Sequence, residues 1–226
     1  MRLKLRSLAA IFAASLLTIL SVSGAARADV LFDFSANDGG WTAQTLAGSQ
    51  LWSWDGGTGS WKVGTSSSVS QTRLLSPLLV ATDTSGAISI DHQYHFEESI
   101  SGCYDGGNLK LSVNGGALSV LDTGDYVGTI SSAHSNPMAG QTAWCSDSSG
   151  GFIVSGAAGT ITPGDIFQFA FDAAWDTSVA LTAPNWEIKS VDILGVELAS
   201  VPEPATIALL GVGLAGLGFS RRRKRA

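Results

Sequence analysis

Short runs of apolar residues, separated by turns rich in glycine, serine and threonine, make up most of the chain between residues 29 and 200. No stretch of this region keeps the apolar period of about 3.6 residues that indicates an amphipathic helix. The runs predict about ten strands, at residues 30–34, 52–55, 60–64, 74–81, 87–96, 108–114, 118–122, 152–156, 166–175 and 185–196. Strands spaced in this way predict an all-β domain, an antiparallel β-sandwich of the jelly-roll type.

Alternation inside two of these runs predicts which side chains are buried. In the sixth run Leu109, Leu111 and Val113 share one face, whereas Lys110 and Ser112 share the other. This pattern is typical of a strand with one face on the core and the other in water. The ninth run predicts a second buried row in the same way, formed by Phe167, Phe169 and Phe171.

The first residues of the chain have the pattern of a secretory signal peptide. Basic residues at positions 2, 4 and 6 precede an apolar stretch, which ends in small residues and the sequence Ala26-Arg27-Ala28. A signal peptidase cleaves after such an Ala-x-Ala site, and the apolar stretch is short for a membrane anchor. We therefore expect residues 1–28 to be removed and the protein to be exported.

Charge is distributed unevenly, because most of the basic residues lie near the two ends of the chain. Residues 29–200 hold 18 of the 19 acidic residues and only four cations, a formal charge of −14. Such a domain repels phosphate backbones, so the sequence excludes nucleic acid as a partner. The four cations are Lys62, Arg73, Lys110 and Lys189.

Two cysteines, Cys103 and Cys145, both stand in glycine-rich, loop-like sequence. In an exported chain this predicts a disulfide between them. The bond would close a loop of about 40 residues and stabilise the fold by roughly 3–4 kcal/mol. A thiol nucleophile or a metal site is disfavoured, because there is no CxxC motif and no histidine nearby.

The sequence shows no catalytic constellation: HExxH, GxSxG and P-loop motifs are all missing. His92 and His95 lie an odd number of positions apart on a predicted strand, so they point to opposite faces and cannot chelate one ion together. His134 stands alone in a predicted loop. One enzymatic alternative stays open, a glycan hydrolase or lyase with paired carboxylates such as Glu97 and Asp172, which would have to flank one cleft.

The middle of the chain, residues 86–195, resembles the β-sandwich accessory domain of secreted metallopeptidases of the immune inhibitor A type, which is related to MAM and lectin-like jelly rolls. The resemblance rests on five ordered segments, "ISIDHQYHFE", "CYDGGNLKLSVNGGALSVL", "NPMAGQTAWCSDSSGGFIV", "FQFAFDAAWDTS" and "NWEIKSVDIL". Near Lys189 the chain departs from that family, which often has an acidic residue there. The resemblance implies the sandwich fold without peptidase activity, because the zinc-binding catalytic domain is absent from this sequence.

Related jelly rolls often hold a structural calcium ion, and the resemblance therefore implies a candidate calcium site. Calcium takes six to eight oxygen ligands, many of them carboxylates in loops. Acidic residues at strand ends or in loops of the matched segment are Glu97, Glu98, Asp105 and Asp147. The alternative is that these side chains only solvate loops and cap turns.

Aromatic residues supply candidates for carbohydrate contact, since sugar sites place exposed rings beside polar groups. The candidates are Trp52, Trp54, Tyr104 and Trp144. The competing interpretation is structural, because tryptophan in a small sandwich usually fills the core or covers a sheet end.

The last 26 residues, 201–226, hold a Pro-Glu-Pro at Pro202, Glu203 and Pro204, an apolar segment at 205–219 and five consecutive basic residues at 221–225. The glycines of the apolar segment match GxGxxG, but no βαβ unit follows, so a nucleotide loop is excluded. As a transmembrane helix the segment is slightly short. The basic cluster would keep the C-terminus in the cytoplasm.

These three ordered features resemble the PEP-CTERM sorting signal of exported proteins in biofilm-forming Gram-negative bacteria. The resemblance implies recognition and cleavage by the membrane enzyme exosortase, with delivery to the cell surface or the exopolymer matrix. The two prolines fit this role, because they keep residues 202–204 extended for a protease cleft. A plain membrane anchor would not require them.

The sequence therefore predicts three parts, a signal peptide at 1–28, a β-sandwich at 29–200 and a sorting signal at 201–226. The expected function is that of a non-catalytic surface or matrix protein that binds polysaccharide or a neighbouring protein. The expected partners are exosortase, an extracellular polysaccharide and, before processing, the membrane through the C-terminal segment.

Overall fold

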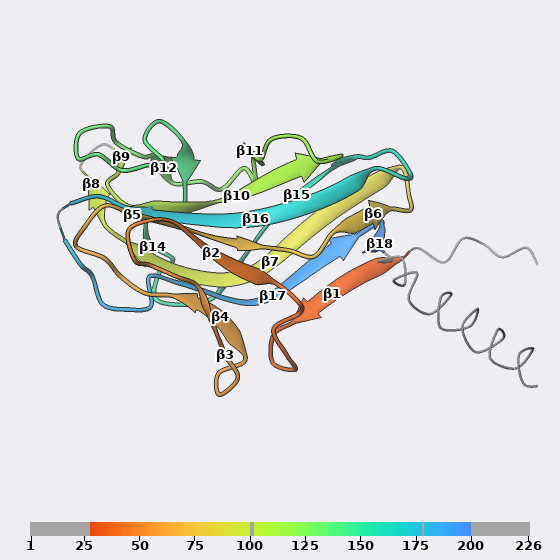
Figure 1. Ribbon diagram of the computed structural model, residues 1–226, viewed down its shortest axis with the longest axis horizontal. Helices are drawn as coiled ribbons and strands as arrows, with labels where there is room; N and C mark the ends of the chain where they lie inside the picture. The colour runs from red at the N-terminus through yellow and green to blue at the C-terminus, as the bar shows by residue number, and fades with distance from the viewer. Residues whose placement is uncertain (1–27, 100–101, 178, 200–226) are drawn as a thin grey trace, which may run out of the picture.

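The computed structural model describes residues 28–99, 102–177 and 179–199, and these form a two-layer sandwich (Figure 1). Two seven-stranded sheets account for most strands, and every named strand pair is antiparallel. The predicted all-β sandwich is therefore confirmed. In the part of the chain that the structure describes, no helix has the length and apolar character that crossing a bilayer requires. The predicted signal peptide and C-terminal helix lie outside the described residues.

The first sheet, sheet A, is built on the long strands β7 and β17, which pair along most of their length. Strand β1 adds to β17, and β15 adds to β7 as an eight-residue partner. The strands of sheet A are β1 (Asp29–Asp33), β3 (Ser53–Asp55), β4 (Ser60–Val63), β7 (Ser85–Phe96), β14 (Ser146–Asp147), β15 (Ile153–Thr160) and β17 (Trp186–Leu194).

The second sheet, sheet B, has β16 at its centre, between β10 and β5. Its strands are β2 (Thr42–Ala47), β5 (Ser70–Leu75), β6 (Leu79–Ala81), β10 (Gly106–Val113), β11 (Ser119–Val120), β16 (Ile166–Trp175) and β18 (Val196–Leu198). Two short ladders complete the fold, β8 (Glu98–Ser99) with β9 (Gly102–Cys103), and β12 (Gly128–Thr129) with β13 (Thr142–Ala143).

Predicted and observed strands agree best where alternation is strong, and the run at 166–175 matches β16 residue for residue. The run at 74–81 divides into β5 and β6, because Pro77 lies between them and cannot donate to a ladder. The run at 185–196 divides at Gly195, whose φ of 78° interrupts an extended strand. The apolar pattern of the sequence does not predict strand β2, because most of its side chains are exposed and form no apolar row.

The core lies between the sheets and is centred on the fully buried Trp186 of β17. Its ring lies 5.3 Å from that of Trp52 and 5.5 Å from those of Trp144 and Phe171, measured between centroids. Gly107 of β10 makes room for it, because a Cβ at this position would overlap the Trp186 ring. This close approach of backbone and ring explains a glycine inside a central strand.

The two predicted buried rows fare differently. Phe167, Phe169 and Phe171 are all buried, as predicted. In the other row Leu109 is buried and Leu111 is half-buried, but the predicted burial of Val113 is wrong, because this last residue of β10 is 41% exposed. The prediction that Lys110 and Ser112 face water is also wrong, because both are buried. The Lys110 ammonium lies 2.8 Å from the carboxylate of Asp172, a fully buried partner on the neighbouring strand.

The predicted disulfide is confirmed, with Cys103 and Cys145 bonded and both buried. It joins β9 to the residue just before β14, at the end of the sandwich where β8, β9 and β14 lie (Figure 1). The described chain begins and ends near the opposite end, at β1 and β18 (Figure 1). There the Gly195 N–H donates to the Ala28 carbonyl at 3.1 Å.

Candidate cation site and ligand-binding surface

Three carboxylates come together at the end of the sandwich near the disulfide. They belong to Glu97, directly after β7, Asp105, directly before β10, and Asp176, directly after β16, and their ligand oxygens lie within 4.8 Å of one another. The antiparallel register of β10 and β16 brings Asp105 opposite the end of β16. The Asp176 N–H then donates to Asp105 Oδ1 at 2.8 Å, and the Asp105 N–H donates to the Glu97 carbonyl.

Two members of this carboxylate group are almost fully buried, Asp105 at 2% and Asp176 at 1% exposure. Burial, together with the charges of Asp176 and Glu97, raises the pKa of Asp105 to about 8, although the hydrogen bond from Asp176 opposes the shift. Like charges held this close resist ionisation unless a cation compensates them. Carboxylate oxygens at strand ends are ligands of the kind that calcium prefers, so this donor set fits a calcium ion.

Of the four predicted calcium ligands, the structure brings Glu97 and Asp105 together and adds Asp176, which no sequence pattern indicates. Asp176 follows the Phe-rich strand β16 in the sequence "AWDTS", and only the strand pairing places it beside Asp105. Glu98 and Asp147 lie outside the group. They line a neighbouring depression of about 310 Å³ together with His95 and Glu97.

The aromatic candidates for carbohydrate contact divide into two pairs. Trp52 and Trp144 are 1% and 0% exposed, so their selection as ligand contacts was wrong and their rings belong to the core. Trp54 is 38% exposed, and its indole N–H donates to the Phe34 carbonyl at 3.0 Å. Tyr104 is half-buried, and its ring packs edge to face with the His134 ring, with the two centroids 5.1 Å apart.

A chain of hydrogen bonds runs from the buried His92 through the buried Ser155 to the exposed Asp125, and it has the composition of a catalytic triad. The Trp186 indole N–H, which can only donate, is 2.9 Å from His92 Nδ1. His92 Nδ1 must therefore accept, and the proton of the neutral ring sits on Nε2, which faces Ser155 Oγ at 2.8 Å. Ser155 in turn donates to the Asp125 carboxylate.

This polarity is the reverse of what nucleophilic catalysis needs. A serine nucleophile gives its proton to an imidazole nitrogen that accepts it, whereas here the imidazole donates to the serine. Burial lowers the pKa of His92 to about 4, partly offset by the charge of Asp125, so the ring stays neutral at physiological pH. The chain of hydrogen bonds is therefore structural, and His92 and His95 do point to opposite faces, one buried and one exposed.

The carboxylate pair that the enzymatic alternative required also has another role. Asp172 is fully buried, with Arg73 at 2.6 and 2.7 Å and Lys110 at 2.8 Å. These contacts occupy both carboxylate oxygens, so neither oxygen is available to a substrate. Glu97 belongs to the carboxylate group with Asp105 and Asp176. The structure thus gives the two acids separate environments and separate partners.

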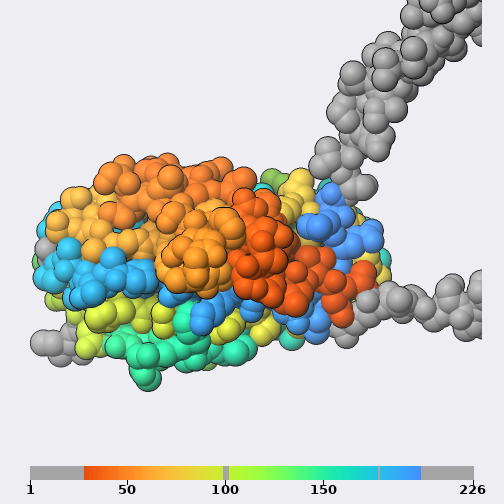
Figure 2. Space-filling model, turned by 90° about the horizontal axis from the view of Figure 1, so that it is seen from below, coloured from red at the N-terminus to blue at the C-terminus, as the bar shows by residue number. Residues whose placement is uncertain are grey.

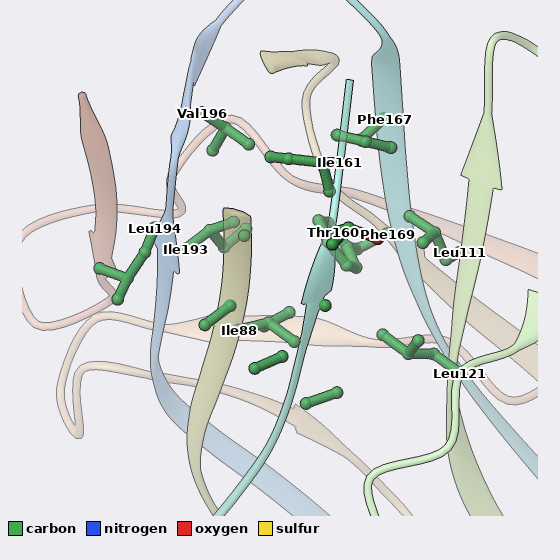
Figure 3. Close-up of a pocket in the computed structure, with 15 residues that line it drawn as sticks. Ile88, Leu111, Leu121, Thr160, Ile161, Phe167, Phe169, Ile193, Leu194 and Val196 are labelled. Carbon is green, nitrogen blue, oxygen red and sulfur yellow. The ribbon is translucent and has the colours of Figure 1, made fainter. Parts of the chain in front are cut away.

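An apolar opening of about 160 Å³ lies between the two sheets beside strand β15 (Figure 3). Side chains from both sheets line it, and Figure 3 shows Ile88, Leu111, Leu121, Phe167 and Phe169 around the opening. Its side chains supply a single hydroxyl, that of Thr160, and no charge. Such a lining offers few hydrogen bonds to a sugar, so this opening is not the ligand surface considered below.

Comparison with protein families matches residues 200–224 to the PEP-CTERM protein-sorting motif. The match covers Pro202, Glu203 and Pro204 and confirms the sequence-based recognition of the C-terminal segment, which lies outside the described residues. No curated protein sequence matches the chain.

Solved structures give distant similarities only. A family 35 carbohydrate binding module from Clostridium thermocellum is 15% identical, with 73% of this chain and 98% of that chain covered and a TM-score of 0.36. The CBM35 from Cellvibrio japonicus Abf62 is 14% identical (77% and 100% covered, TM-score 0.33), and peanut lectin with a 9mer peptide is 11% identical (77% and 99% covered, TM-score 0.38). At these TM-scores the similarities assign no ligand to the chain. The resemblance to immune inhibitor A accessory domains finds no support among them.

Proposed function

We propose that this protein is a non-catalytic, exported protein that exosortase delivers to the cell surface or the exopolymer matrix, where its sandwich binds extracellular polysaccharide. The observation that carries the proposal is the sorting motif at residues 200–224. The N-terminal pattern supports it, because a chain that is sorted outside the cytoplasm must first be exported. The strongly acidic sandwich, with its polar surface depressions, is the part that would be delivered.

Each feature of the C-terminal segment has a role in this proposal. The apolar residues 205–219 hold the chain in the membrane until it is processed, and the basic residues 221–225 fix the C-terminus on the cytoplasmic side. Pro202 and Pro204 keep the stretch between sandwich and membrane extended, so that a protease cleft can bind its backbone. The sandwich then lies outside the membrane.

The carboxylate group of Glu97, Asp105 and Asp176 has a structural task in the same proposal, as ligands of a calcium ion. These residues lie directly next to the ends of three strands, and the strands come from both sheets: β7 from sheet A, and β10 and β16 from sheet B. A cation bound between them would hold both sheets together at this end of the sandwich. It would also compensate the buried charge that Asp105 carries once it loses its proton to bind the ion.

The sorting part of the proposal is tested by the double variant Pro202→Ala, Pro204→Ala in the producing cell. We expect a larger, membrane-bound precursor to accumulate, because the extended motif that the enzyme binds is lost. Mass spectrometry of the protein in membrane and extracellular fractions measures this. An Ala205→Ser variant, which leaves Pro202, Glu203 and Pro204 intact, serves as the control, and normal maturation of the double variant would refute exosortase sorting.

A further inference from the structure

The outer face of sheet A carries a groove of about 430 Å³ between β1, the β3–β4 hairpin and the central strands β7 and β17. Figure 2 views the molecule from a side on which β1, the hairpin and β17 meet. The side chains that line the groove are mostly polar, unlike those of the apolar opening beside β15. Its polar side chains are Asp33, Ser35, Thr58, Asp91, Lys189 and Ser190.

The walls of this groove are held by close packing of the hairpin against β1. Gly59 in the hairpin has a φ of 64°, and a Cβ there would lie 2.6 Å from the Cα of Ser35. Glycine is thus required both for its backbone angle and for the approach of the two segments. The bond from the Trp54 indole to the Phe34 carbonyl ties the same hairpin to the end of β1. The groove is therefore preformed.

Lys189 reaches the groove because of an irregularity in β17. The register of β17 against β7 shifts between Ile188 and Ser190, which leaves Lys189 as the extra residue of a bulge. Bulges turn a side chain away from its regular direction. The Lys189 ammonium lies 3.6 Å from the centroid of the Phe152 ring, which holds the side chain in place.

Lys189 also differs from the other cations among residues 28–99, 102–177 and 179–199. Lys62, Arg73 and Lys110 each form an ion pair with a carboxylate. Lys189 makes a cation–π contact instead, so its ammonium can still donate hydrogen bonds toward the groove. The bulge thus presents this donor beside two acceptor carboxylates, those of Asp33 and Asp91.

The lining matches the chemistry of an uncharged sugar. Neighbouring hydroxyls of a sugar ring donate to carboxylates and accept from an ammonium or a hydroxyl, all of which line this groove. The Leu31 side chain, 63% exposed at the groove, offers an apolar surface to the C–H face of a ring. We infer that this groove binds neutral sugar units of an extracellular polysaccharide, an inference that rests on the proposed function.

Charge decides between neutral and acidic polymers. The groove holds two carboxylates against one ammonium, and residues 29–200 carry a formal charge of −14. A polymer of uronic acids would be repelled both by the groove and by the field of the whole domain. A neutral polymer meets no such repulsion.

The test uses the mature protein purified after export, in affinity gel electrophoresis. A soluble β-glucan and a galactan are the neutral probes, and alginate is the acidic probe. We expect a neutral probe to retard the protein and alginate to leave its mobility unchanged. Asp91→Asn and Lys189→Met each remove hydrogen bonds to a charged group, so we expect each to weaken retardation about tenfold or more. Glu197→Gln, which makes the same charge change as Asp91→Asn at an exposed residue of β18, should bind like the wild type.

The outcomes separate this inference from the proposed function. Undiminished binding of a neutral probe by both groove variants, with unchanged thermal unfolding, would overturn the groove and leave the polysaccharide-binding function standing. Retardation by alginate alone would overturn the neutral class of ligand. If the wild type binds none of the three polymers, both the inference and the polysaccharide-binding function fail.

Discussion

Two groups of carboxylates, at different places in the sandwich, differ in how their negative charge is compensated. Asp172, in the middle of sheet B, lies between Arg73 and Lys110, so the chain itself supplies the compensating charge. Glu97, Asp105 and Asp176, at the end of the sandwich, bring three acids within 4.8 Å of one another. Burying a carboxylate is costly unless it is paired. The first group is therefore a structural cluster of ion pairs, whereas the second is the candidate cation site.

The largest effect on stability is expected from Asp172→Ala, which breaks both ion pairs of the first group. The buried Lys110 and the half-buried Arg73 would lose their partner, which typically costs about 3–5 kcal/mol of unfolding free energy. Denaturant unfolding measures this. Adding Lys110→Met should restore part of the stability, because it removes the uncompensated buried charge. A loss below about 1 kcal/mol in the single variant would contradict the role assigned to Asp172.

The buried His92, which is hydrogen-bonded to the buried Ser155, predicts how stability changes with pH. Burial lowers the pKa of His92 from 6.5 to about 4, so the unfolded chain binds a proton more readily than the folded protein between these values. Stability should therefore fall as the pH drops from about 6.5 to about 4, by up to roughly 3 kcal/mol. The measurement compares pH profiles of unfolding for the wild type and His92→Gln, because the difference isolates this group. Parallel profiles would contradict the assignment.

The smallest of the three effects concerns calcium at the carboxylate group. Calcium at about 100 times its dissociation constant should stabilise the protein by about 2.7 kcal/mol, and a chelator should reverse the gain. Asp105→Asn should abolish the response, whereas Asp122→Asn, at an exposed loop residue, should keep it. Calorimetric unfolding with and without calcium measures both. An equal response from Asp105→Asn and the wild type would place calcium elsewhere.

Strands with strong alternation were predictable from sequence because their burial is decided locally. Strand β16 and the buried row of Phe167, Phe169 and Phe171 show this. The burial of Lys110 was not predictable, because it depends on Asp172 and Arg73, which neighbouring strands supply. Sequence alternation describes one strand at a time and does not reveal partners across a sheet.

The candidate cation site was half predictable for the same reason. Glu97 and Asp105 were predictable because they are acidic residues between two predicted strands. Asp176 joins them only because the register of β10 with β16 places it beside Asp105. Tryptophan also gave an ambiguous signal. Trp52 and Trp144 are core residues, while Trp54 stays partly exposed, and residue type alone does not distinguish these cases. The disulfide was predictable because the domain offers two cysteines and the chain is marked for export.

The first and last strands of the sandwich, β1 and β18, lie at the same end of the domain, which matters for a protein that is held at a surface. Ala28 and Gly195 are hydrogen-bonded, so the segments that lead into and out of the sandwich join it at the same end. The carboxylate group lies toward the opposite end, next to β8 and β9 (Figure 1). Domains whose ends meet in this way act as self-contained modules that tolerate insertion or fusion at that point. A label or second domain joined there would leave the carboxylate group, at the other end of the sandwich, unobstructed.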